Sequence, residues 1–189
     1  MRIGFLLLCG GRSSRMGQSK ALLKVGGMPL AERVALAGAG FDERIFSVND
    51  DGIPTPEGFI RVSDLYTLCG PMGGLHAALT QTACDALVVA PCDAPRYSAQ
   101  LAQYLAQQYT PGVDALILRD DTGKAHPLMG VYARSCLPAL EAHLRSERFK
   151  LMRMLDSLNT REIVLPAPLS QDIFENLNTP EDLTRFLRG

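Results

Sequence analysis

The sequence predicts a three-layer α/β/α fold built around a mostly parallel sheet. Short apolar runs alternate with longer amphipathic stretches along the chain, and several runs end in glycine or proline. The composition agrees with a packed fold, because 47% of the 189 residues are hydrophobic and 21% are charged. No repeat or linker interrupts the alternation, so we expect a single domain over residues 1–189.

The apolar runs are bounded by turn residues and predict strands. These are Ile3–Leu8, Arg44–Val48, Ala86–Ala90, Ala115–Leu118, Leu128–Ala133 and the short Phe174–Leu177. The amphipathic stretches predict helices, several of which begin with an N-cap serine or with proline in the first turn. These are Pro29–Ala37, Pro71–Gln81, Ser98–Gln108, Ser135–Leu144 and a last helix from Pro180 to about Arg188.

Charge and cysteine usage exclude several classes of protein. The net charge is −1 and the pI about 6.3, so no bulk positive field holds a nucleic acid. The first apolar run is too short for a signal peptide or a membrane span, and we expect a cytoplasmic protein with no membrane contact. The five cysteines include no Cys-x-x-Cys pair, which favours small buried hydrophobic residues over a disulfide framework or zinc site.

The loop that follows the first strand has the parts that a triphosphate needs. Ligands of such sheets bind outside the carboxyl ends of the strands. Gly10 and Gly11 allow a sharp turn with exposed N–H groups, while Arg12, Arg15 and Lys20 add positive charge. Neither a Walker A loop nor a Gly-x-Gly-x-x-Gly fingerprint fits here. Glycines and cations alone leave a purely structural loop equally open.

Asp93 directly follows the strongest predicted strand, in the string Pro91-Cys92-Asp93-Ala94-Pro95. A carboxylate there projects toward the same edge as the first loop. Magnesium prefers one or two carboxylates, with phosphates and waters completing its shell. We therefore predict Asp93 as a Mg²⁺ ligand; a turn-capping aspartate is the alternative.

The first-loop string Gly-Gly-x-Ser-x-Arg-Met-Gly-x-x-Lys resembles the signature of nucleotidyltransferases with the glycosyltransferase-A-type, Rossmann-like fold, and is most similar to molybdenum cofactor guanylyltransferases. The segment around Asp93 is similar to the metal-binding segment of that family. The string Asn-x-Asn-Thr-Pro, from Asn176 to Pro180, closely matches its C-terminal motif. The resemblance runs from Ile3 to about Leu187. Two positions depart from the pattern: Ser19 replaces an acid that is common there, and Cys9 replaces the usual alanine.

The resemblance also implies the site. Catalysis would rest on Arg15 and Lys20, which hold the β- and γ-phosphates, and on Asp93. The nucleotide-binding set it implies is Leu8, Cys9, Gly10, Gly11, Arg12, Lys20, Asn49, Asp64, Gly70, Pro71, Gly74 and Asp93. Asn176 and Asn178 would face the pterin acceptor.

Taken alone, several of these residues leave a structural role open. Asn49 and Asp64 also suit turns, and Gly70-Pro71 also suits a simple helix start. Asn178 also suits a cap of the last helix. His126 lies in a segment that resembles a His-Pro segment of the family, with a structural histidine as the favoured interpretation. Arg148 and Lys150 leave open contact with an anionic second substrate or a solvated helical face.

The implied reaction is transfer of GMP from GTP to the terminal phosphate of molybdopterin cofactor, with release of pyrophosphate and with Mg²⁺ as cofactor. Residues up to about 95 would bind the nucleotide and residues from about 96 to 189 the acceptor. The expected partners are GTP and molybdopterin cofactor. We expect a monomer or weak homo-oligomer that transiently contacts other cofactor-biosynthesis proteins or acceptor molybdoenzymes. Alternatives are a cytidylyltransferase for the same pterin, a sugar-phosphate nucleotidyltransferase and a GTP-binding protein without turnover.

Overall fold

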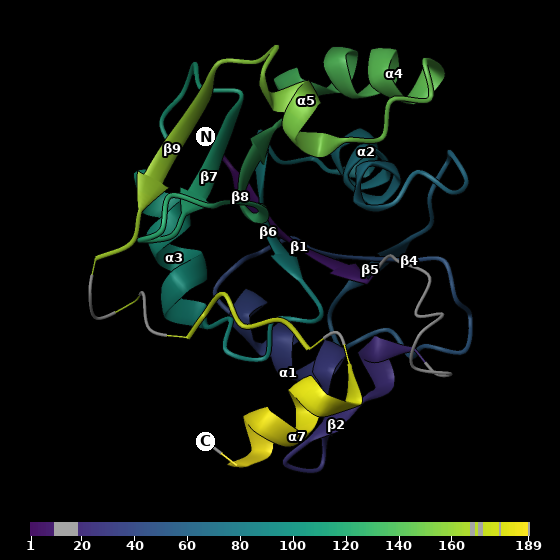
Figure 1. The fold of residues 1–189 in the computed structure, drawn as a ribbon. Coiled ribbons are helices and arrows are strands. Elements are labelled where there is room, and N and C mark those ends of the chain that lie inside the picture. Colours follow the sequence, from purple (N-terminus) through teal and green to yellow (C-terminus); the bar gives the residue numbers. More distant parts are fainter. Residues whose placement is uncertain (10–18, 167–168, 170–171, 178, 189) are drawn as a thin grey trace.

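A seven-stranded sheet divides the protein into layers (Figure 1). The computed structural model describes residues 1–9, 19–166, 169, 172–177 and 179–188. The strand order is β5-β4-β1-β6-β8-β7-β9. The strands are β1 (Ile3–Cys9), β4 (Arg44–Val48), β5 (Ile60–Val62), β6 (Ala86–Pro91), β7 (Ala115–Arg119), β8 (Ala125–Ala133) and β9 (Thr160–Val164).

Most neighbouring strands run parallel. Only β8 is antiparallel to its neighbours β6 and β7, while every other pair in this sheet is parallel. A separate antiparallel ribbon joins β2 (Lys24–Val25) to β3 (Met28–Pro29). The expected mostly parallel sheet is confirmed.

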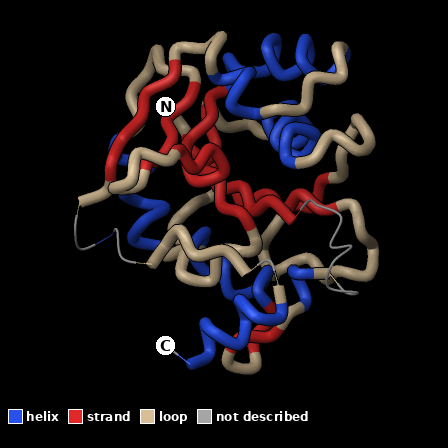
Figure 2. The backbone as a smooth tube through the Cα atoms, viewed as in Figure 1, coloured by secondary structure: helices blue, strands red, loops and turns tan. Residues whose placement is uncertain are grey.

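Helices cover both faces of the sheet, as Figures 1 and 2 show. α2, α4 and α5 lie on one face, and α1 and α3 lie on the other. The helices are α1 (Leu30–Ala35), α2 (Pro71–Gln81), α3 (Ala99–Gln108), α4 (Leu137–Arg145), α5 (Leu151–Leu155) and α7 (Pro180–Arg188), with 3-10 turns η1 (Lys20–Leu22), η2 (Leu36–Gly38) and η3 (Arg134–Cys136). Side chains along β1 alternate between the two faces of the sheet. Phe5 and Leu7 pack in the core under α1 and α3, and Leu6 and Leu8 pack in the core on the opposite face.

A third, smaller core ties the C-terminal segment to the first half of the chain. Leu177 and Leu30 are fully buried there, together with Leu23 and Val25 around the β2–β3 ribbon. Phe186 of α7 packs against the same cluster. This contact anchors the end of the chain beside the start of α1.

Two kinds of expectation fail. Phe174–Leu177 forms no strand; the N–H of Leu177 donates to a carbonyl outside the sheet, that of Asp93, at 2.9 Å. The sequence also gives no signal for β5, β9, α5 or the β2–β3 ribbon, because these elements are short, and β5 and β9 are edge strands with several polar or exposed positions. The helix expected at Pro29–Ala37 is divided into α1 and η2. Within the described residues, no helix is long and apolar enough to cross a membrane.

Candidate active site

Three parallel strands deliver polar residues to one edge of the sheet. β1, β4 and β6 are adjacent and parallel, so their carboxyl ends meet there. Asn49 directly follows β4, and Asp93 comes two residues after β6. Lys20 is the first residue of the 3-10 turn η1, which follows the first loop in the sequence. This edge is where the fold class places its ligands.

Lys20 and Asp93 meet at this edge. Lys20 Nζ lies 3.3 Å from Asp93 Oδ2, although the two residues are 73 positions apart in the sequence. Their side chains are 24% and 20% exposed, so both groups reach solvent from a mostly covered position. A cation and a carboxylate are thus side by side where a polyphosphate and its counterion can approach.

The backbone around Asp93 is held from two directions. The N–H of Cys92 donates to the carbonyl of Leu8 in β1 at 3.0 Å. The carbonyl of Asp93 accepts the bond from Leu177. Asp93 is therefore bonded directly to the C-terminal segment, and its neighbour Cys92 is bonded to the first strand. The link to Leu177 is not visible in the sequence, where Leu177 is one more apolar residue beside the asparagine motif.

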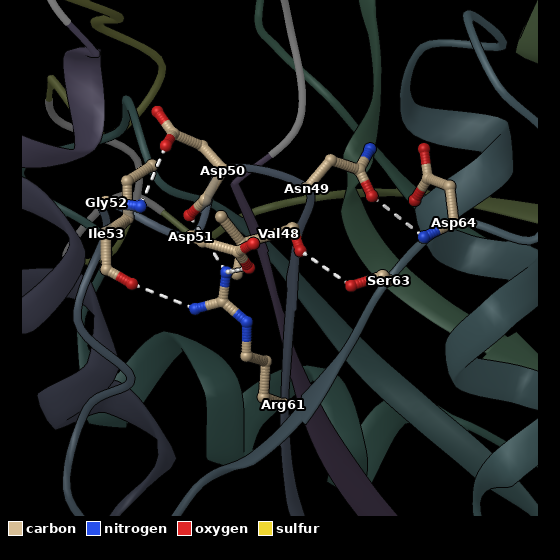
Figure 3. Close-up of polar contacts among 9 residues, drawn as sticks. All are labelled: Val48, Asn49, Asp50, Asp51, Gly52, Ile53, Arg61, Ser63 and Asp64. Carbon is tan, nitrogen blue, oxygen red and sulfur yellow. Dashed lines mark hydrogen bonds and ion pairs between the residues drawn. The ribbon is translucent and has the colours of Figure 1, made fainter.

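Asn49 and Asp64 form a second pair at the same edge (Figure 3). The N–H of Asp64 donates to Asn49 Oδ1 at 2.8 Å, and Ser63 Oγ donates to the carbonyl of Val48 at 3.3 Å. Burial raises the pKa of the Asp64 carboxyl, and a separate side-chain hydrogen bond between Asn49 and that carboxyl opposes the rise. The two residues thus lie together, and the side chain of Asn49 is exposed at the rim.

Arg61 fixes the turn that follows Asn49, a role that sequence reasoning missed. Its guanidinium donates to the carbonyls of Ile53 at 2.9 Å and Asp50 at 2.8 Å, and lies 3.3 Å from Asp51 Oδ1 (Figure 3). Five N–H donors on a rigid plane suit such a set of carbonyls. The available signal was an arginine inside an otherwise apolar edge strand, but a solvated charge explains that equally well.

Two glycines at the start of α2 have distinct structural reasons. Gly70, the N-cap, has φ +60°, which favours glycine. Gly74 is buried, and a Cβ there would lie too close to Ser47 Oγ and 2.8 Å from Leu8 Cδ2. Gly74 therefore allows α2 to approach β1 and β4 closely. Pro71 occupies the first helical position, as expected.

The described part of the C-terminal segment lies beside β8. The ring of Phe174 stacks on His126 with centroids 4.0 Å apart, and His126 Nε2 is 2.9 Å from Asp120 Oδ2. That hydrogen bond holds the pKa of Asp120 below its usual value. Asn176 is exposed, two residues beyond this stack and next to Leu177. The sequence favours a structural role for His126 and predicts Phe174 in a short strand, and neither pattern indicates this stack.

Several predicted site residues lie outside the described residues, namely Gly10, Gly11, Arg12, Arg15 and Asn178. Of the residues before the loop, Leu8 is buried in the core and Cys9 is partly buried. Burial raises the pKa of the Cys9 thiol well above its usual value, and contact with the Cys92 thiol and the charge of Asp93 add to the rise. Arg148 and Lys150 are exposed between α4 and α5.

The predicted Mg²⁺ site involves a single carboxylate, that of Asp93. Over the described residues there is no group of three or more His, Cys, Asp or Glu side chains that could hold a metal ion. Asp93 nevertheless suits Mg²⁺, because it is partly exposed at the ligand edge and Mg²⁺ often takes one protein carboxylate beside phosphates and water.

Comparisons with known proteins agree with this geometry. Residues 5–162 match the model of the MobA-like NTP transferase domain. The chain is 35% identical to the probable molybdenum cofactor guanylyltransferase of Pelotomaculum thermopropionicum, over 95% of this chain and 89% of that one. It is 32% identical to the molybdenum cofactor guanylyltransferase of Serratia proteamaculans, over 96% and 92% of the two chains.

A solved structure is also similar. The crystal structure of molybdopterin-guanine dinucleotide biosynthesis protein A from Archaeoglobus fulgidus superposes with a TM-score of 0.81 at 28% identity, covering 100% of this chain and 97% of that one. The 2-C-methyl-D-erythritol 4-phosphate cytidylyltransferase of Thermus thermophilus shares the fold with a TM-score of 0.67 at 16% identity. The expected nucleotidyltransferase fold is confirmed.

Proposed function

The chain belongs to the MobA-like NTP transferase family, and we propose that it acts as a molybdenum cofactor guanylyltransferase. In this reaction an oxygen of the terminal phosphate of molybdopterin cofactor forms a bond to the α-phosphorus of GTP. The bond from that phosphorus to the oxygen bridging to the β-phosphate breaks, and pyrophosphate leaves. The observation that carries the proposal is the approach of Lys20 to Asp93 within 3.3 Å at the ligand edge.

Positioning and charge are what the protein has to supply for this reaction. The attacking phosphate is already anionic at neutral pH, so no general base is required. Lys20 would hold β- and γ-phosphate oxygens and stabilise the departing pyrophosphate. Arg15 is proposed to assist it from the first loop. The bond from the N–H of Leu177 to the carbonyl of Asp93, and the bond from the N–H of the neighbouring Cys92 to Leu8, hold the backbone that carries this carboxylate.

Asp93 would hold Mg²⁺ in this proposal. When bound, the ion supplies charge neutralisation at the phosphate oxygens. Lys20, so close to the same carboxylate, would then turn toward phosphate oxygens that approach the pair. The two groups would thereby act on one triphosphate.

Asn49 and Asp64 are proposed to contact the nucleoside. The buried side of Asp64 lies against the first turn of α2, since a Cβ on Gly73 would be 2.7 Å from Asp64 Oδ2. A carboxylate can accept the adjacent N1–H and N2–H donors of guanine together, whereas cytosine offers one amino group beside an acceptor. This arrangement would favour GTP, in agreement with the guanylyltransferase relatives, and the cytidylyl alternative is not favoured.

The acceptor is proposed to bind beyond residue 95. Asn176 is exposed on the segment that Leu177 attaches to Asp93, so an acceptor held there would lie near the nucleotide phosphates. Asn178 is proposed to act beside it. The chain would then bring its two substrates together from its two halves.

The proposal is tested by pyrophosphate release from GTP and from CTP, each with molybdenum-loaded molybdopterin and Mg²⁺. We expect release with GTP and at least a tenfold lower rate with CTP. Reactions without the pterin and without Mg²⁺ are the controls and should give no release. Tight GTP binding with no release would instead support a binding protein, and a faster rate with CTP would support a cytidylyltransferase.

A further inference from the structure

Two cysteines lie at the ends of neighbouring strands beside the candidate active site: Cys9 is the last residue of β1, and Cys92 directly follows β6. In the parallel register of β1 and β6, Leu7 is opposite Ala90 and Leu8 is opposite Pro91. Continuing by one residue sets Cys9 opposite Cys92. The N–H of Cys92 donates to the carbonyl of Leu8 at 3.0 Å, which holds Cys92 beside the end of β1.

Both thiols lie on the same face of the sheet. Side chains alternate between faces along a strand, and Leu7 and Ala90 belong to the core under α1 and α3. Cys92 belongs to that core and Cys9 packs against it. The raised pKa of the Cys9 thiol has contact with Cys92 among its causes, which agrees with the two sulfur atoms being adjacent.

This arrangement meets the distance requirement of a disulfide. Neighbouring strands lie about 4.8 Å apart, and disulfide-bonded residues have Cα atoms roughly 4.4–6.8 Å apart. The other three cysteines, Cys69, Cys84 and Cys136, all belong to the core on the opposite face. The sheet itself separates them from Cys9 and Cys92. Among the five cysteines, the geometry thus selects one pair across the β1–β6 ladder.

We propose that Cys9 and Cys92 form a site of reversible oxidation, where a peroxide converts the two thiols into an intramolecular disulfide that stops nucleotidyl transfer. The first sulfur attacks one peroxide oxygen, the O–O bond breaks, and a sulfenic acid and one water form. The second thiol then attacks the sulfenic sulfur, the S–S bond forms, and a second water leaves. The two thiols lose two electrons, which the peroxide gains.

The position of the bond explains its effect on transfer. Cys9 directly precedes the first loop, and Cys92 directly precedes Asp93. Drawing the sulfurs from contact to a bond of about 2.05 Å shifts the strand ends that carry the loop and the carboxylate. This effect rests on the proposed function, whereas formation of the disulfide does not.

The first test maps the bond itself. The full chain is treated with excess hydrogen peroxide, its thiols are counted after denaturation, and its peptides are analysed by mass spectrometry. We expect the five thiols to fall to three, with one cross-link joining the peptides of Cys9 and Cys92. Cys84→Ala, which removes a buried thiol from the opposite face, should still form the cross-link, and Cys9→Ala should not. Five remaining thiols, a different cross-link, or oxygen addition without a cross-link would overturn the proposal.

The second test compares oxidised and reduced activity within each protein, so that differences in basal rate cancel. We expect oxidation to lower pyrophosphate release at least tenfold in the parent chain and in Cys84→Ala, and dithiothreitol to restore it. In Cys9→Ala the ratio should stay near one. A mapped cross-link with an unchanged ratio would overturn the regulatory claim. If the reduced chain released no pyrophosphate at all, the proposed function would fail, while the mapping would still decide whether the oxidation site exists.

Discussion

The two halves of the sheet place their candidate site residues by different means. In the first half, Asn49 and Asp93 follow buried parallel strands, so the strand ends fix where they lie. In the second half, Asn176 lies on an irregular segment that is held by the bond from Leu177 to Asp93 and by the stack of Phe174 on His126. Strand ends position residues through the ladder, whereas the proposed acceptor side depends on a few long-range contacts.

Asp93 is one of the residues through which the two halves are in contact. The side chain of Asp93 contacts Lys20, and its carbonyl is bonded to Leu177. A change on the acceptor segment can therefore be transmitted to the proposed metal ligand through one hydrogen bond. If the first half binds the nucleotide and the second half binds the acceptor, substitutions in the two halves should affect different steps.

The largest effect is expected at the pair that defines the nucleotide half. Lys20→Ala and Asp93→Ala should each lower turnover at least ~100-fold, which corresponds to about 2.7 kcal/mol, because charge stabilisation at the phosphates is lost. Steady-state pyrophosphate release measures this. Arg153→Ala, which removes an exposed cation in the other half, is the matched control and should stay near the parent rate. Near-parental rates for both site variants would remove the mechanism.

The next effect concerns the close packing of α2 on the nucleotide half. Gly74→Ala should lower the free energy of unfolding by about 1–3 kcal/mol, because its Cβ would crowd Ser47 and Leu8. Urea unfolding of the ligand-free chain measures this. Adding Ser47→Ala should recover part of the loss, since it removes the oxygen in the way. An unchanged stability of the single variant would show that α2 is free to move away from the sheet.

A smaller effect should separate the acceptor half. Asn176→Ala should raise the KM for molybdopterin cofactor about tenfold, roughly 1.4 kcal/mol, and leave the KM for GTP within a factor of two. Asn159→Ala, an exposed amide elsewhere in this half, is the control. If the KM for GTP rose as much as that for the acceptor, the division of the chain into two binding halves would be wrong.

The smallest effect is a pH dependence at Asp64. Burial raises its folded-state pKa above the unfolded value, so the folded protein retains this proton to higher pH. The free energy of unfolding should consequently fall as the pH rises from about 4 through the folded pKa. Asp64→Asn should lack this slope and gain stability relative to the parent chain near neutral pH, while binding GTP more weakly. Paired urea titrations between pH 4 and 7 check it, and parallel curves for the two proteins would contradict it.

The candidate site residues whose position the sequence predicts lie mainly in the first half of the chain, and the segment that it misplaces lies in the second. The sequence identifies β1 and β6 because their residues are apolar over the whole run, and β4 because three of its five residues are apolar. It therefore places Asn49 and Asp93 at one edge. It misses β5 and β9, whose edge positions include exposed and polar residues. The bond from Leu177 to Asp93 joins residues 84 positions apart and leaves no local pattern. For the same reason, the segment from Phe174 is wrongly expected to be a strand.

The pair Cys9 and Cys92 is only partly predictable from the sequence. Their types and positions are plain in the sequence, and the expectation of buried cysteines is met for Cys92, whereas Cys9 is only partly buried. What the sequence lacks is the register of β1 against β6, which sets them opposite each other. A single residue of slip in that register would put the two side chains on opposite faces.

The central claim is that Lys20 and Asp93 act on one triphosphate, with Asp93 holding its metal ion. Calorimetric titration of a GTP analogue carrying a methylene bridge between the α- and β-phosphates, with and without Mg²⁺, tests this directly. We expect Mg²⁺ to tighten binding at least tenfold in the parent chain and to have no effect in Asp93→Asn. Equal tightening by Mg²⁺ in both proteins would contradict the account.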